Sequence, residues 1–518
     1  GYNWTTYPER LQKAGVSWKV YQNMPDNFTD NPLAGFKQYR LANELSGKPV
    51  NNDTDCPAYD AAIDATQPLY KGIANTMPDG GFLGSFKDDI AKGELPKVSW
   101  LVAPATYSEH PGPSSPVQGA WYIQEVLNAL TQNPEIWSQT VFLINFDEND
   151  GFFDHVPSPS APSKDVTGQV YGKSTLTDQQ MSYEYATHAK ASAGQPNFTD
   201  AKVSNGVGVY GPGIRVPMYI ISPWSRGGWV NSQVFDHSSI ILFLEQCFGV
   251  EEPNISPYRR AVCGDLTSAF DFKTPNTTAL PALDGNRSKA QADAIRVAQG
   301  LLPQVIRPIS QAYPVQETGI RPSRALPYIL HSSAKVDVKA RSITLKFANT
   351  GKQAAVFHVY DRLNLDAMPR RYMVEAGKEI DDEIKIASSH YDFWVLGPNG
   401  FHRTFVGNID QAIQAEALPE IRVCVEECSA HLYLKVRNDA AKTAKLLVKA
   451  NAYLGQKTWN IETAATEQEL YWDMSEFGGW YDFTVSIDGD NSFKRRFAGR
   501  IETGKDSISD PFMGYIES

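Results

Sequence analysis

The chain has 518 residues, 42% of them hydrophobic and 21% charged, a composition typical of a globular protein with roughly two to four domains. It contains no apolar run of about 18 residues, which excludes a membrane-spanning helix of the ordinary kind. The net charge of −11 argues against nucleic-acid binding and leaves transient contact with a lipid surface open.

Strands and helices alternate over residues 1–272. In chain order the patterns predict a helix at 7–14, a strand at 16–21, a helix at 82–91, a strand at 98–103, a helix from Pro116 to about Leu130, a strand at 141–146, a strand at 217–221 and a helix after Asp236 as its N-cap. Alternation of this kind indicates parallel βαβ units. We therefore predict an α/β fold with a doubly wound sheet over residues 1–272.

Proline residues punctuate residues 273–330, which we interpret as a linker that packs along the first domain, with one helix near 289–298. After residue 330 the pattern becomes strand-like and repeats. Tyr391–Val395 returns as Tyr481–Val485, and Phe401–Gly407 returns as Phe493–Gly499, with a spacing of about 90 residues. This predicts two tandem all-β sandwich modules, residues 331–419 and 420–518. Neither carries a catalytic cluster, so a structural or surface-binding role is favoured for both.

The most informative segment follows the predicted strand at 141–146. It contains Asp147, Glu148, Asp150, Asp154 and His155 within nine positions. The apolar run before it fits a central parallel strand, and ligands bind beyond the carboxyl ends of such strands. The alternative is an acidic surface loop with a structural histidine.

Two further loops carry histidine beside a carboxylate after a predicted strand. They are Glu109-His110, after 98–103, and Asp236-His237, after 217–221. If all three loops lie at one edge of the sheet, their side chains can converge. Carboxylates and imidazoles suit a divalent metal and the hydrolysis of phosphate esters, in which histidine protonates the leaving oxygen. The sequence shows no GxSxG signature and no convincing nucleophile.

Five cysteines are present, an odd number, so they cannot all pair with one another. None has zinc-like CxxC spacing. Cys247 with Cys263, or Cys424 with Cys428, could form disulfides in an exported protein.

These motifs resemble the bacterial phosphocholine-preferring phospholipases C, which are related to a secreted acid phosphatase and to the alkaline phosphatases. The resemblance covers essentially the whole chain. It is carried by Gly1–Gln22, Pro104–Ala120, Phe146–Pro159, Arg215–Leu244, Glu252–Phe272, Arg321–Leu330 and both C-terminal repeats. It implies an alkaline-phosphatase-like catalytic domain followed by two small β domains.

The resemblance also implies roles for particular residues. Asp236 and His237 stand where the family holds a divalent metal, whose identity stays open. Glu109, His110, Asp154 and His155 stand among the catalytic residues, and Asp147 and Glu148 would support the imidazoles. Trp224 and Trp229 are candidates for contact with a choline headgroup.

The implied function is a phospholipase C that cleaves phosphatidylcholine or sphingomyelin, in a bacterial protein that is secreted or periplasmic. Family members carry an upstream segment with an export signal, two metal ligands and the Ser or Thr nucleophile. We therefore expect this chain to be inactive alone and to need that segment, as a possible separate polypeptide. The alternatives are a broad-specificity acid phosphatase and a non-catalytic surface-binding protein. Comparing a soluble choline phosphodiester with a phosphate monoester, on chains with and without the upstream segment, would separate all three.

Overall fold

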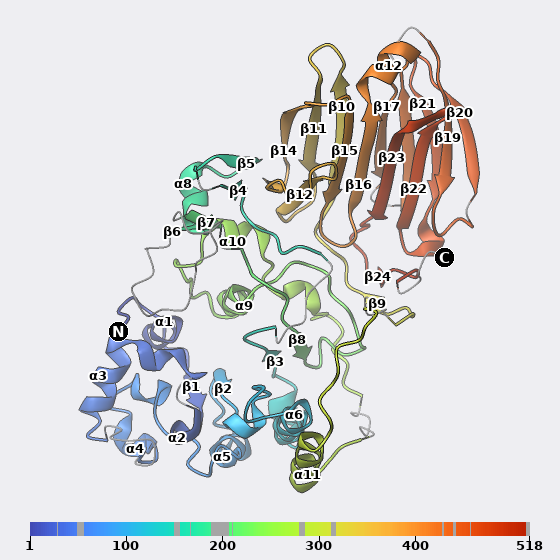
Figure 1. Ribbon diagram of the computed structural model, residues 1–518. Coiled ribbons are helices and arrows are strands. Elements are labelled where there is room, and N and C mark those ends of the chain that lie inside the picture. The colour runs from blue at the N-terminus through green and yellow to red at the C-terminus, as the bar shows by residue number, and fades with distance from the viewer. Residues whose placement is uncertain are drawn as a thin grey trace.

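The computed structural model describes residues 1–27, 30–48, 56–149, 156–165, 167–187, 207–209, 211–278, 285–311, 317–426, 429–438, 442–455 and 457–513. A helix-rich part contains the N-terminus, and an all-β part contains the C-terminus (Figure 1). The predicted order, an α/β part followed by all-β modules, is confirmed.

Helices dominate the first part. They are α1 (Tyr7–Lys13), α2 (Met24–Asn27), α3 (Lys37–Leu45), α4 (Ala61–Asp64), α5 (Gly84–Lys92), α6 (Pro116–Thr131), α7 (Pro134–Trp137), α8 (Asp178–Met181), α9 (Ser238–Phe248), α10 (Pro257–Val262) and α11 (Lys289–Gly300). The predicted helices α6 and α11 are confirmed. Helix α6 begins with proline in its first turn and buries Tyr122, Val126 and Leu130 on one face. Within the described residues, no helix is both long and apolar enough to span a membrane.

The strands of the first part are short. They are β1 (Trp18–Tyr21), β2 (Val98–Leu101), β3 (Phe142–Asn145), β4 (Ser163–Lys164), β5 (Val170–Ser174), β6 (Tyr185–Thr187), β7 (Val207–Val209) and β8 (Met218–Ile221). Strands β1 and β2 pair in parallel, as the βαβ pattern predicts. Strands β6 and β7 pair with each other in antiparallel fashion.

The prediction that the strand at 141–146 is a parallel strand was wrong. Strand β3 pairs with β8 in antiparallel fashion, with Phe142 opposite Ile221 and Asn145 opposite Met218. An apolar run reports burial and carries no information about direction, and mixed pairings are common in large α/β proteins. The carboxyl ends of β3 and β8 therefore lie at opposite ends of this pair. Residues 222–237 must run back along the pair to bring the loop before α9 beside the end of β3.

The described residues of the β part form mostly strands. The elements are β10 (Leu330–Asp337), β11 (Ser342–Asn349), β12 (Ala355–Asp361), β13 (Arg370–Val374), β14 (Lys378–Lys385), β15 (His390–Leu396), β16 (His402–Asn408), α12 (Ile409–Ala415), β17 (Glu420–Glu426), β18 (His431–Arg437), β19 (Lys445–Ala450), β20 (Thr458–Glu462), β21 (Gln468–Asp473), β22 (Trp480–Ile487), β23 (Asp490–Arg500) and β24 (Ser507–Ile508). Strand β24 pairs with the linker strand β9 (Pro322–Ser323). Each repeat contributes a three-stranded sheet, β10-β11-β14 or β17-β18-β21.

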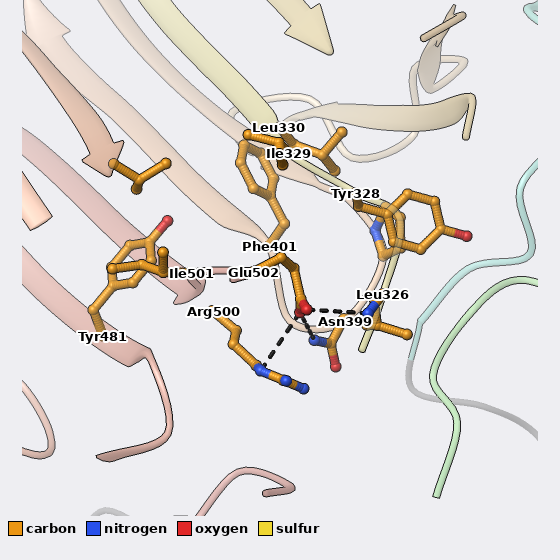
Figure 2. A pocket seen from close by; sticks show the side chains of 12 residues that line it. Leu326, Tyr328, Ile329, Leu330, Asn399, Phe401, Tyr481, Arg500, Ile501 and Glu502 are labelled. Atoms are coloured by element: carbon orange, nitrogen blue, oxygen red, sulfur yellow. Dashed lines mark hydrogen bonds and ion pairs between the residues drawn. The ribbon is translucent and has the colours of Figure 1, made fainter. Parts of the chain in front are cut away.

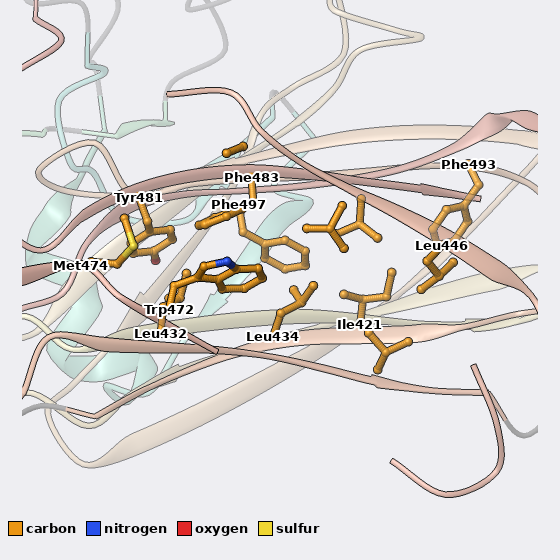
Figure 3. Packing of buried hydrophobic residues seen from close by; sticks show 14 of the residues in the cluster. Ile421, Leu432, Leu434, Leu446, Trp472, Met474, Tyr481, Phe483, Phe493 and Phe497 are labelled. Atoms are coloured by element: carbon orange, nitrogen blue, oxygen red, sulfur yellow. The ribbon is translucent and has the colours of Figure 1, made fainter. Parts of the chain in front are cut away.

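The two repeats share one sheet. Its order is β20-β19-β22-β23-β16-β15-β12-β13-β5-β4, so that β16 of the first repeat pairs with β23 of the second. Each three-stranded sheet faces its own half of this long sheet across a separate apolar core. Figure 3 shows the core of the second repeat, where Trp472 and Leu434 from the small sheet lie opposite Phe483 and Phe497 from the long sheet. The limits of the two modules as independent domains stay a prediction.

Arg403 and Arg495 join the repeats by exchanged contacts. Arg403 of β16 donates to the Tyr481 hydroxyl at 2.8 Å and to the Ala498 carbonyl at 2.7 Å, both in the second repeat. Arg495 of β23 donates to the Tyr391 hydroxyl at 2.8 Å and to the Val406 carbonyl at 2.5 Å, both in the first. The two sets of contacts are equivalent, because each arginine donates to one tyrosine hydroxyl and one backbone carbonyl of the other repeat. The sequence repeat is therefore matched by a repeat in the contacts.

The first part also joins the long sheet. Strand β5 pairs in parallel with β13, with Gly172 opposite Arg371 and Ser174 opposite Met373. A Cβ on Gly172 would lie 1.9 Å from the Arg371 carbonyl oxygen, so only glycine permits this approach. The two parts of the chain are therefore connected by strand pairing in addition to the linker.

Candidate active site

The loop after β2 turns Glu109 and His110 in different directions. Glu109 has a left-handed backbone, with φ of 68°, which is unfavourable for a residue other than glycine. Its amide donates to the Ser114 hydroxyl at 3.0 Å, and its side chain lies against Gly119 of α6. A Cβ on Gly119 would be only 2.1 Å from the Glu109 Cγ. The loop thus holds Glu109 against the helix and leaves His110 exposed.

The segment after β3 is described only as far as residue 149. Asp147 and Glu148 are exposed there. Asp154 and His155 lie outside the described residues, as do Asp150, Phe152 and Phe153, so their proposed roles stay predictions.

Asp236 is already held by neighbours. One carboxylate oxygen accepts from the Ser238 amide at 2.9 Å, and the other accepts from the Arg259 guanidinium of α10. Helix α9 begins at Ser238 with His237 as its N-cap, one residue later than the sequence predicts. The Asp236 side chain still accepts from the first amide of that helix.

His237 reaches the end of β3. Its Nε2 lies 3.0 Å from the carbonyl oxygen of Phe146, the residue that precedes Asp147, and its side chain is exposed. The return of residues 222–237 along β8 makes this contact possible despite the antiparallel pairing. The structure therefore brings the predicted His237 and Asp147 loops together.

Asp30, which the sequence reasoning missed, is influenced by both His110 and Asp147. Burial raises the pKa of Asp30, and the Asp147 carboxylate raises it further while His110 lowers it. Asp26 acts on the same carboxyl, and its own side chain accepts from the Ala105 amide of the loop after β2 at 2.9 Å. Asp26 and Asp30 follow β1, so the same signal, acidic residues directly after a strand, could have identified them.

Loops that follow three strands thus converge with the start of α9. They supply Asp26 and Asp30, His110, Asp147, and His237. Carboxylates and two exposed imidazoles lie in these loops. Such a cluster can hold an anionic group on imidazolium and can donate a proton to a leaving oxygen.

The described residues do not form a complete metal site. They contain no group of three or more His, Cys, Asp or Glu side chains placed to hold one ion. Asp236, the predicted ligand, has both oxygens engaged by Ser238 and Arg259. This donor set does not fit a divalent metal as it stands, so it supports no chemical step through one.

Trp224 and Trp229 are engaged in packing. Trp224 lies beside Phe272, with ring centroids 5.6 Å apart, and packs against the core that includes Phe243 and Phe270. The Arg324 guanidinium lies 4.2 Å from the ring centroid of Trp229. Among the described residues, neither ring is brought to the loop cluster by an observed contact, so headgroup contact by these two residues stays a prediction.

Helix α11 of the linker contacts the loop both before and after His110 in the sequence. Asp293 accepts from the Tyr107 hydroxyl at 2.9 Å and from the Gln118 side chain at 3.0 Å. Arg296 donates to the Gly112 carbonyl at 3.1 Å. Lys289 pairs with Asp293 at 3.0 Å and lies 5.1 Å from the Tyr107 ring centroid. The linker is therefore part of the structure that positions this loop.

A small cavity lies away from the loops that carry His110, Asp147 and His237. It measures about 30 Å³ and is located where residues 326–330 meet the ends of the long sheet (Figure 2). Glu502 there accepts from the Leu326 amide at 3.1 Å and lies 3.5 Å from Arg500, and burial raises the pKa of Glu502. The space suits about one water molecule. It contains none of the predicted site residues and serves as a junction between linker and sheet.

Two of the cysteines bear on the predicted disulfides. Cys247 is exposed on α9 and Cys263 is buried, and both are free thiols. The predicted alternative of a Cys247–Cys263 disulfide is therefore not formed. Cys428 lies outside the described residues.

Comparison with known proteins connects both parts of the chain to one group. Residues 1–251 match the phosphoesterase family, and residues 322–408 and 419–500 match the bacterial phospholipase C C-terminal domain. The non-hemolytic phospholipase C of Pseudomonas aeruginosa is 48% identical over 99% of this chain and 69% of its own length. The non-hemolytic enzyme of Burkholderia pseudomallei is 39% identical, and the hemolytic phospholipase C of Pseudomonas aeruginosa is 36% identical, each over 99% of this chain and 70% of its own length.

Proposed function

Because the chain belongs to the phosphoesterase family and carries the C-terminal domain of bacterial phospholipases C, we propose that it acts as a phospholipase C on choline phospholipids. The observation that carries this proposal is the 48% identity to a phospholipase C over nearly the whole chain. The convergence of His110, Asp147 and His237 at the strand ends supports it.

In the proposed reaction water replaces diacylglycerol on phosphorus. The phosphorus–oxygen bond to glycerol breaks, and its electron pair leaves with the glycerol oxygen, which needs a proton. His110 is an exposed imidazole that acts on Asp30 of the cluster, so we assign it the donation of that proton. His237 would lie beside the phosphate, the proton released by the attacking water restores His110, and no residue is assigned to activate that water.

The finer parts of the proposal rest on the family resemblance. They are the preference for a choline headgroup, the roles of Asp154 and His155, and an exported location. A phospholipid substrate fits a protein that is secreted or periplasmic. The substrate preference can be read directly from a comparison of two soluble esters.

The test compares p-nitrophenyl phosphorylcholine with p-nitrophenyl phosphate, for the parent protein, meaning this chain together with the upstream segment that the family resemblance implies, and for its His110→Ala variant. We expect turnover of the diester, and a decrease of about 10²–10⁴-fold in kcat for His110→Ala. The matched control is His390→Ala, which changes another exposed histidine on β15 of the β part. Preferential turnover of the monoester would instead favour a phosphatase. Equal effects of the two histidine variants would remove His110 from the site.

A further inference from the structure

Residues 297–309 form an exposed apolar segment directly after the contacts of α11 with the His110 loop. Six aliphatic side chains in this stretch have exposed fractions between 67% and 108%: Val297, Leu301, Leu302, Val305, Ile306 and Ile309. Large aliphatic residues are normally buried, and single exposed ones need no explanation, but a contiguous group indicates a binding surface. This group is called the apolar segment below.

The charge of the region differs from that of the whole chain. Residues 294–316 contain Arg296 and Arg307 and no Asp or Glu, whereas the chain as a whole has a net charge of −11. Basic residues beside exposed aliphatic side chains are typical of segments that lie in a lipid headgroup layer. The local charge therefore favours a lipid surface, whose phosphates are anionic, as the occupant of the apolar segment.

The apolar segment is fixed beside the candidate site. Arg296 donates to the Gly112 carbonyl, two residues from His110, and Asp293 holds Tyr107. From α11 the chain continues along the first part toward β9 (Figure 1). Val297 lies on α11, and prolines at 303 and 308 prevent the helix from continuing, so the other five side chains extend from irregular backbone.

From this geometry we infer that residues 297–309 are a lipid-surface docking segment that seats the His110 loop at the phosphate layer of a membrane. The aliphatic side chains enter the boundary between headgroups and acyl chains, and Arg307 contacts lipid phosphates. The inference rests on the proposed function, because an enzyme that cleaves phospholipids has to bring the His110 loop to a lipid surface.

The experiment measures binding and turnover separately. Vesicle co-sedimentation uses phosphatidylcholine vesicles with and without phosphatidylglycerol, and the proteins carry His110→Ala so that the lipid stays intact. The test variant is Val305→Ser/Ile306→Ser/Ile309→Ser. The matched control is Leu363→Ser/Leu365→Ser/Met368→Ser, which changes three exposed apolar side chains in the loop between β12 and β13.

We expect the test variant to bind vesicles roughly tenfold more weakly or worse, because burial of several aliphatic groups is lost. With His110 restored, it should lose activity on vesicles and keep turnover of the soluble choline ester. The control should match the parent protein. Arg307→Glu should weaken binding mainly to vesicles that contain phosphatidylglycerol.

Several results would overturn the inference. They are a parent protein that does not bind vesicles, equal losses in the test and control variants, or loss of soluble-ester turnover in the test variant. A change from oligomer to monomer in light scattering, with vesicle binding retained, would identify the segment as a contact between copies of the chain. If the parent protein hydrolyses neither ester, the proposed function fails, and the sedimentation result still decides the docking.

Discussion

The two parts of the molecule use charged side chains in opposite ways. In the first part, Asp147, His110 and His237 are exposed at strand ends and converge, although carboxylates repel one another there. In the β part, Arg403 and Arg495 are only 2% and 3% exposed, and each has hydrogen-bond partners in the other repeat. Exposed and crowded charge is typical of functional sites, whereas these buried arginines connect the two repeats.

The strongest test of this contrast is Arg403→Met. It would leave the Tyr481 hydroxyl and the Ala498 carbonyl without their buried donor. Unpaired buried groups cost about 1–3 kcal/mol each, so the free energy of unfolding should fall by about 3 kcal/mol. Urea denaturation measures this. Arg341→Met, which removes an exposed pair with Asp410, should cost less than about 1 kcal/mol. Equal losses would contradict the contrast.

The second test concerns His358 of β12, which is 2% exposed. Burial, and then Arg371, lowers the pKa of His358 to about 3. The unfolded chain takes up this proton below about pH 6.5 and the folded protein does not, so stability falls as the pH decreases from about 6.5 toward 3. The expected loss is about 2 kcal/mol between pH 6.5 and pH 5.

Denaturation at several pH values with His358→Gln as the comparison isolates this contribution. The variant should show a flatter dependence on pH over that range. An unchanged slope would show that His358 takes up no proton on unfolding, or that other groups cause the dependence. His402, whose pKa burial lowers to about 4, contributes in the same direction and should remain in both proteins.

The third test concerns positioning by the linker. Asp293→Asn weakens the hold on Tyr107 and Lys289 without removing the side chain. If α11 positions the His110 loop, kcat on the soluble ester should fall about tenfold with KM little changed. Asp366→Asn on the β12–β13 loop is the control. A loss of thermal stability that accounts for all of the lost activity would argue against positioning.

The smallest expected effect tests the symmetry of the repeats. Tyr391→Phe and Tyr481→Phe each remove one hydrogen bond from a buried arginine. Each should reduce the free energy of unfolding by about 1 kcal/mol. Denaturation curves of both variants should agree within error. A large difference would show that the two exchanged contacts are not equivalent.

The sequence predicted elements better than it predicted their pairing. Helix α6 and the parallel pair β1–β2 followed from apolar spacing and a first-turn proline. The direction of β3 did not, because an apolar run contains no information about its partner. The 90-residue repeat indicated two modules, but the shared sheet depends on the β16–β23 register, which the repeat leaves open.

The candidate site was predicted in part. His110, Asp147 and His237 were chosen because they follow strands, and the structure brings their loops together. Asp26 and Asp30 were missed because no histidine accompanies them. Asp236 illustrates a limit of motif reasoning. Its partner Arg259 lies on another helix, and no local spacing reveals that contact.

The pairing of β5 with β13 has a consequence for synthesis. Thr175 accepts a hydrogen bond from the amide of Glu375, which is 200 residues further along the chain. At synthesis rates of about 5–20 residues per second, the partner of β5 emerges roughly 10–40 s after β5 itself. Until then the β4–β5 hairpin has an open edge that can pair with other chains. The nascent protein therefore passes through an interval in which protection of that edge, by a chaperone or by rapid elongation, should determine how much of it folds correctly.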